Sequence, residues 1–209
     1  MRKRIFNIFC VIAVTIVLLV TVSPASYAAS LEIAQQVDNA ANLNACAKET
    51  IDINKYGGAD LQNPTEILSQ DGVLETPLEV KYGDNVIAGC PVHLRSYNGN
   101  LVGPTLRVKP SDRMKIALVN SLPPQPEHTG SSNTPHDFNT TNFHTHGFHV
   151  SRSDRADNIL REMEPNKNEG DPDPSYPIEI ELPLRHPAGT HWYHAHHHGS
   201  TAIQVSNGI

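Results

Sequence analysis

The chain has 209 residues and a formal net charge of −6 at pH 7, and 38% of its residues are hydrophobic. An acidic chain without a basic cluster is a poor candidate for binding nucleic acids or anionic membrane surfaces, so we expect neither partner. The length supports one sandwich-sized domain with appendages and excludes an array of several domains.

The N-terminus has the pattern of a signal peptide. Basic residues at positions 2–4 precede an uncharged apolar run over 5–22, and the small residues Ser26 and Ala28 that follow predict cleavage after Ala28. Loss of 1–28 removes three basic and no acidic residues, which makes the net charge −9 (13 minus 22). We therefore expect a secreted or periplasmic protein. The alternative is an uncleaved N-terminal anchor, because the apolar run is close to the lower length limit of a membrane span.

Residues 29–75 are polar, rich in Asn and Ala, and without sustained periodicity, although 31–47 is compatible with one short helix. We expect a leader segment that packs on the following domain or stays mobile.

Two cysteines remain after the signal peptide, Cys46 and Cys90. An oxidising compartment permits a disulfide between them, but the sequence does not give their distance. A Cys46–Cys90 disulfide and two unpaired thiols both stay open.

From Thr76 onward the pattern predicts β-strands. Apolar residues alternate with polar ones over 114–118 and 178–182, as in half-buried strands, with Glu179 and Glu181 facing outward. The inward-facing residues are Met114, Ile116, Leu118, Ile178, Ile180 and Leu182. Turn signals separate such runs at 82–85, 98–100, 109–112 and 186–189. Short strands at this spacing predict an all-β sandwich or barrel.

Two longer polar loops interrupt the strands. The loop 121–141 is rich in Pro, Ser, Asn and Thr, and the loop 162–175 is acidic and rich in Pro and Gly. We interpret both as solvated surface loops, with a weak cation or substrate role for the acidic one as the alternative.

Two His-x-His pairs carry the functional information. They are His144 with His146 and His194 with His196, and strand alternation points each pair to one face. Imidazole binds copper, zinc, iron and nickel, so four histidines predict a metal site without selecting its metal. His149 and His198 lie close by in sequence, and we interpret them as supporting residues and not as ligands.

The motifs resemble the first cupredoxin domain of a multicopper oxidase. The resemblance extends from about Val80 to the end of the chain and implies a cupredoxin-like Greek-key β-sandwich over 76–209. Its segments are Asn142–Gly147 and His191–His196, preceded by Gly103–Val108 and followed by Gly199–Ala202.

The resemblance also implies which copper ion each histidine would bind. In the family, a mononuclear type 1 copper takes electrons from a reducing substrate and passes them to a trinuclear cluster that reduces dioxygen to water. His144 would bind the type 2 copper, and His146, His194 and His196 the two type 3 coppers. Asp157 lies where the family often has an acidic residue near the cluster, so it is a candidate proton donor or supporting residue. The alternative is that Asp157 is an aspartate of a turn without a role in the site.

Half of the histidine ligands that the family uses for its cluster are not found in this sequence. The family builds its cluster between two cupredoxin domains with eight histidines, and this chain supplies four. No methionine follows the segment Cys90–His93 within reach and no histidine precedes it, so we expect no type 1 site. Thr201–Ile209 resembles the approach to a closing strand that does not follow, so we expect a domain incomplete at its C-terminus. A missing domain or partner chain would complete the cluster, and the chain alone would not turn over substrate.

Three other interpretations stay open. The first is an exported, non-catalytic domain that binds or sequesters copper. The second is a zinc hydrolase, because His144–His149 is similar to the His-x-His-x-Asp-His motif of metallo-β-lactamases, although Phe148 stands where that motif requires aspartate. In the third, the histidines only pack. The sequence does not identify the reducing substrate.

Overall fold

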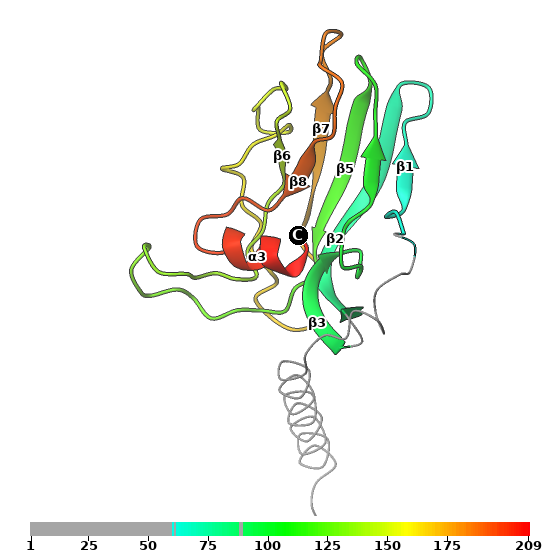
Figure 1. Ribbon diagram of the computed structural model, residues 1–209. Helices are drawn as coiled ribbons and strands as arrows, with labels where there is room; N and C mark the ends of the chain where they lie inside the picture. The colour runs from blue at the N-terminus through cyan, green and yellow to red at the C-terminus, as the bar shows by residue number, and fades with distance from the viewer. Residues whose placement is uncertain (1–59, 61, 88–89) are drawn as a thin grey trace, which may run out of the picture. The chain divides into compact units, whose positions relative to one another are not determined.

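The computed structural model describes residues 60, 62–87 and 90–209, all within the compact unit Cys46–Ile209. Strands dominate this part of the chain (Figure 1). The elements are β1 (Glu66–Leu68), β2 (Val73–Ile87), β3 (Cys90–Tyr97), β4 (Thr105–Arg107), β5 (Arg113–Asn120), β6 (His144–His146), β7 (Ser175–Glu181), β8 (Trp192–His194) and α3 (Thr201–Asn207).

Four strands form the main sheet, in the order β3, β2, β5 and β7 (Figure 1). β2 pairs antiparallel with β3 and parallel with β5, and β5 pairs antiparallel with β7. Two short sheets accompany it, with β1 parallel to β4 and β6 antiparallel to β8.

The inner face of the main sheet holds the core. Met114, Ile116 and Leu118 on β5 are at most 2% exposed, and the alternation predicted for 178–182 is present on β7. Burying one such side chain fully contributes about 1.5–3 kcal/mol. Phe143 and Ala195, which adjoin β6 and β8, belong to the same core cluster. The β6–β8 pair is therefore tied to the main sheet by shared apolar packing.

One predicted turn is wrong. The Gly- and Asn-containing stretch 82–85 lies inside β2, which continues to Ile87. Gly83 is needed for a different reason, since a Cβ at this position would collide with the backbone of Gly99 in the turn that follows β3. The Asn85 side chain also donates to the Gly99 carbonyl at 3.2 Å. The turns predicted at 98–100 and 109–112 are confirmed, with positive φ at Asn98 and Ser111.

The β structure begins earlier than Thr76. β1 and the first residues of β2 fall in the stretch interpreted as a leader, because β1 is only three residues long and shows no periodicity. The predicted signal peptide and the helix at 31–47 lie outside the described residues. No helix among those described is long and apolar enough to cross a bilayer. Export therefore stays a prediction.

The segment Thr201–Asn207 forms the helix α3, where the sequence pattern suggested the approach to a strand. Its Gln204 is fully buried and donates to the carbonyls of Phe138 and Thr140, which attaches the helix to the loop 121–141. Gly208 ends the helix in a left-handed conformation.

Cys90 is the first residue of β3 and is disulfide-bonded. It is therefore not an unpaired thiol. Cys46 lies outside the described residues.

We expect Asp112→Ala to destabilise the fold. The buried Asp112 carboxylate accepts hydrogen bonds from the Ser69 hydroxyl at 2.5 Å and from the Lys109 amide at 2.8 Å, and these bonds lower its pKa. Loss of the acceptor should reduce the free energy of unfolding at pH 7 by about 1–3 kcal/mol, measured by urea denaturation. Asp112→Asn, which keeps an oxygen acceptor, is the matched control and should lose less.

The same contact sets a pH dependence. A carboxyl whose pKa is lowered on folding stabilises the fold above its unfolded pKa, about 3.9, and this contribution is lost as the pH falls through the lower folded pKa. The difference between Asp112→Ala and the unsubstituted chain should therefore be constant near neutral pH and shrink in acid. A difference that grows on acidification would contradict this account.

Candidate metal centre

The two His-x-His motifs form the paired strands β6 and β8. His144 lies directly opposite His194, and His146 lies opposite Trp192. Alternate residues of one strand share a face, and so do residues directly opposite each other on neighbouring strands. The register therefore places these four side chains on one face of the ladder.

The four predicted ligands lie together in the structure. The His144 ring centroid is 5.3 Å from those of both His194 and His196, and the His194 centroid is 5.9 Å from that of His146. One ligand nitrogen from each of His144, His146 and His194 lies within 4.8 Å of the other two. His196 joins the group from just beyond the end of β8. Among the described residues, no other group of three potential ligands is this compact.

The cluster is buried on one side and open on the other. His194 is 4% exposed and His144 is half-buried, whereas His146 and His196 are exposed. The cluster is therefore accessible to solvent from one side.

His194 is prepared to act as a ligand. Its Nδ1 lies 2.9 Å from the Ala195 carbonyl, which can only accept, so Nδ1 carries the proton and Nε2 the lone pair. This Nε2 is buried and has no hydrogen-bond partner within the described residues. Burial and the neighbouring imidazoles lower the pKa of His194 against the opposing effect of the Ala195 contact. The ring is therefore held in the neutral form that metals bind.

Asp157 fixes the orientation of His144. Its carboxylate is 5% exposed and accepts a hydrogen bond from His144 Nδ1 at 2.8 Å. It also accepts from the Thr145 amide at 3.3 Å and the Thr145 hydroxyl at 2.7 Å. His144 Nε2 is left as the ring nitrogen that could bind a metal. A carboxylate behind a ligating histidine is the usual arrangement at metal sites.

Asn142 positions His196 and was not identified from the sequence. Its fully buried side chain accepts a hydrogen bond from the His196 amide at 2.5 Å and donates to the carbonyls of His196 and Ile159. It therefore holds the segment after β8 against the start of β6. The only signal for this role in the sequence is that Asn142 lies two residues before His144.

Strand alternation places Trp192 on the face of β8 that carries His194, but its contact with the cluster was not predicted from the sequence. Its ring stacks on His194 at 4.2 Å and 18° and on His146 at 5.0 Å and 30°. The indole is 49% exposed, so it forms part of the rim of the cluster.

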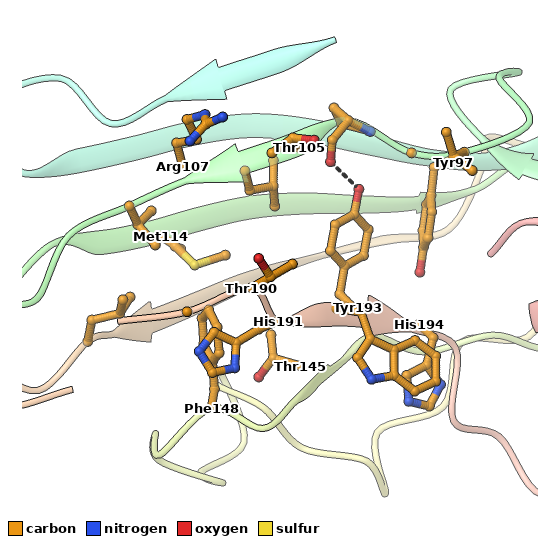
Figure 2. A pocket seen from close by; sticks show the side chains of 18 of the residues that line it. Tyr97, Thr105, Arg107, Met114, Thr145, Phe148, Thr190, His191, Tyr193 and His194 are labelled. Carbon is orange, nitrogen blue, oxygen red and sulfur yellow. Dashed lines mark hydrogen bonds between the residues drawn. The ribbon is translucent and has the colours of Figure 1, made fainter. Parts of the chain in front are cut away.

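The opposite face of the ladder borders a cavity of about 670 Å³. Figure 2 shows Tyr193 crossing this cavity toward the strand on its far side, where its hydroxyl donates to the Pro104 carbonyl at 2.7 Å. Met114 and Phe148 provide part of the apolar lining, and His191 also points into it (Figure 2). Tyr193 thereby attaches β8 to the segment before β4.

The other histidines near the motifs lie apart from the cluster. His149 is beside His186, with ring centroids 5.8 Å apart, and His198 is beside His136 at the same separation. Phe148 packs edge-on against His186 and His191 and supplies no ligand, which counts against the zinc hydrolase.

The chain is similar to known proteins in sequence and in fold. No family model matches the chain. The multicopper oxidase mco of Staphylococcus aureus is 36% identical over 117 residues, which are 54% of this chain and 20% of that protein. The multicopper oxidase mco of Staphylococcus epidermidis is 34% identical over 117 residues, again 54% of this chain and 20% of that protein. The chain thus spans about one fifth of the length of these curated relatives.

Solved structures show the fold. A multicopper oxidase from Campylobacter jejuni, described as a metallo-oxidase, superposes with a TM-score of 0.55 at 21% identity over 75% of this chain and 29% of that one. A multicopper oxidase from Pediococcus acidilactici gives a TM-score of 0.53 at 22% identity, over 73% of this chain and 28% of that one. The all-β, cupredoxin-like fold class is confirmed. Sequence and fold together relate this chain to the multicopper oxidases, as the histidine motifs predicted.

Proposed function

We propose that this chain is a copper-binding domain of a multicopper oxidase, corresponding to the first cupredoxin domain. It would contribute half of the histidines of a trinuclear type 2 and type 3 copper cluster. The observation that carries the proposal is that one ligand atom from each of His144, His146 and His194 lies within 4.8 Å of the other two. In addition, His194 Nε2 is buried and has no hydrogen-bond partner within the part of the chain that the structure describes. An all-imidazole donor set without a thiolate suits copper.

The roles of the individual histidines follow from the family resemblance. His144 would bind the type 2 copper, and His146, His194 and His196 the type 3 pair. Bound copper would supply the one-electron redox chemistry for the reduction of dioxygen to water. A second cupredoxin domain, in the same protein or in a partner, would approach the exposed side and bring the remaining ligands together with a reducing substrate.

The chain's own residues hold the site in shape. Asp157 orients His144, Asn142 places His196, and the Ala195 carbonyl fixes the proton of His194 on Nδ1. Because all three contacts to the Asp157 carboxylate are donated to it, Asp157 suits a positioning role better than that of a proton donor.

An exported domain that sequesters copper without catalysis is the second candidate. It is favoured by the fact that one chain alone gathers four imidazoles, enough to bind an ion. The two functions differ in what the complete protein does. Tight copper binding by a protein that never consumes oxygen, even with its other domains present, would favour sequestration.

The single tryptophan gives a direct test of copper binding. Since Trp192 stacks on two proposed ligands, Cu²⁺ at the cluster should quench its fluorescence, while redox-inert Zn²⁺ should not. His146→Ala and His194→Ala should weaken this quenching. The matched control is His93→Ala, because His93 stacks on Tyr82 and pairs with Asp84 outside the cluster. Equal quenching in all variants would contradict the proposed site.

The positioning role of Asp157 is tested by Asp157→Ala. Loss of a carboxylate behind a metal-binding histidine typically costs 10–100-fold in metal affinity. We expect a loss in this range in Cu²⁺ titrations, and partial recovery with Asp157→Asn, which keeps an oxygen acceptor for His144. Asp154→Ala is the control, because Asp154 lies in the same loop but is exposed and pairs with Arg161. An affinity no lower than that of the control would refute the role.

The copper-loaded chain alone should show no sustained oxygen uptake with a phenol or a diammonium dye. One reason is that a cluster with half its histidines is incomplete. The other is that we expect no type 1 copper site through which electrons could enter, since Cys90, the one cysteine in the described part of the chain, is in a disulfide. The measurement is oxygen consumption with an oxygen electrode after copper loading. Catalytic turnover by the 209 residues would overturn the view that further domains are required.

A further inference from the structure

A second group of four histidines lies outside the proposed cluster, around His136. The His128 ring stacks on it with centroids 4.2 Å apart, and those of His198 and His197 lie at 5.8 and 6.4 Å. Two of these side chains come from the loop 121–141 and two from the segment after β8. We call these four residues the second histidine cluster.

Three of these rings have one nitrogen fixed by a backbone carbonyl of the segment 131–134. A carbonyl only accepts, so the nitrogen facing it carries the proton and the other nitrogen carries a lone pair. Metal-binding histidines are prepared in the same way, by donating the proton of the non-ligating nitrogen. The contacts are His128 Nε2 to Ser131 O at 3.3 Å, His136 Nδ1 to Thr134 O at 2.6 Å and His198 Nε2 to Ser132 O at 2.8 Å.

The fourth ring, His197, is buried and unsatisfied. It is 6% exposed, and neither of its nitrogens has a hydrogen-bond partner among the described residues, although Nδ1 lies 2.9 Å from Glu162 Oε1. A buried nitrogen without a partner costs free energy that a bound cation would recover. The loop 162–175, interpreted from the sequence as solvated, thus places a carboxylate beside an imidazole.

The backbone is shaped to admit His136. Gly199 has φ of +93°, and a Cβ at this position would come within 2.6 Å of the His136 ring. A glycine is therefore required for His136 to approach the segment that carries His197 and His198.

The surroundings carry negative charge. A cavity of about 470 Å³ next to the cluster is lined by His128 and by Glu127, Asp137 and Glu164, with Lys167 as the opposing charge. Asp137 Oδ2 lies 3.8 Å from His136 Nε2, the nitrogen that bears the lone pair. Excess carboxylate charge around prepared imidazoles favours a cation.

We propose that the second histidine cluster is a separate binding site for one copper ion. Imidazole donors suit several divalent metals, and Cu²⁺ is the ion they bind most tightly in the first-row series. Its ligand atoms are less closely spaced than those of the first cluster, so the side chains from 121–141 must turn inward when the ion binds. The proposal does not rest on the function proposed for the first cluster.

The test removes the first cluster and asks whether copper still binds. The full chain with His144→Ala and His194→Ala is dialysed against Cu²⁺ with glycine as a competing ligand, and bound metal is counted by elemental analysis. We expect one copper per chain. Adding His128→Asn and His136→Asn should weaken this binding at least tenfold. Adding His93→Asn and His149→Asn, two exposed histidines elsewhere, is the matched control and should leave binding unchanged.

Two results would overturn the proposal: no copper bound in the His144→Ala, His194→Ala background, or equal loss in the control. If these variants lose their circular dichroism spectrum, labelling of the unsubstituted chain with diethyl pyrocarbonate decides. Saturating Cu²⁺ should then protect His128, His136 and His198 from modification, read by mass spectrometry, while His93 stays reactive. Unchanged labelling of the three rings would refute the site.

Discussion

The pairing of β6 with β8 in a single register, His144 opposite His194, is the constraint on which the candidate metal centre depends. A slip of one residue would turn Thr145 or Tyr193 toward the metal side and the histidines toward the core. The ladder is only three residues long on each side, so main-chain pairing alone does not secure it. Its register is held by what lies at its two faces.

On the core face, Phe143 and Tyr193 stack with centroids 5.4 Å apart, and the Tyr193 hydroxyl is anchored to the Pro104 carbonyl. On the metal side, Asn142 and Asp157 bond to the backbone or ring of the histidine segments. Phe143, Tyr193 and Asn142 lie within two residues of a proposed ligand in sequence, whereas Asp157 is 13 residues from His144. Packing of the core and geometry of the site are therefore not separable in this fold.

Much of the site was predictable because its determinants are local. Two-residue alternation places the histidine pairs on one face, and the same rule identified the buried residues of β5 and β7. Several of the differences between sequence and structure have non-local causes. Gly83 is required by Gly99, sixteen residues away, and not by a turn of its own. Gln204 bonds to the carbonyls of Phe138 and Thr140, more than sixty residues away in sequence. The imidazoles around His136 likewise come from separate segments, so no local sequence pattern predicts either contact.

The network behind the ligands has a thermodynamic consequence. His144 and His194 are held by their hydrogen bonds, and the Asn142 side chain fixes the backbone of His196, before any ion arrives. The conformational entropy of ordering this face is then lost during folding and not on metal capture. Little apolar surface changes its exposure when the first ion binds, so the heat capacity of the chain should hardly change. An ion that entered this face would therefore meet two imidazoles, those of His144 and His194, that are already oriented.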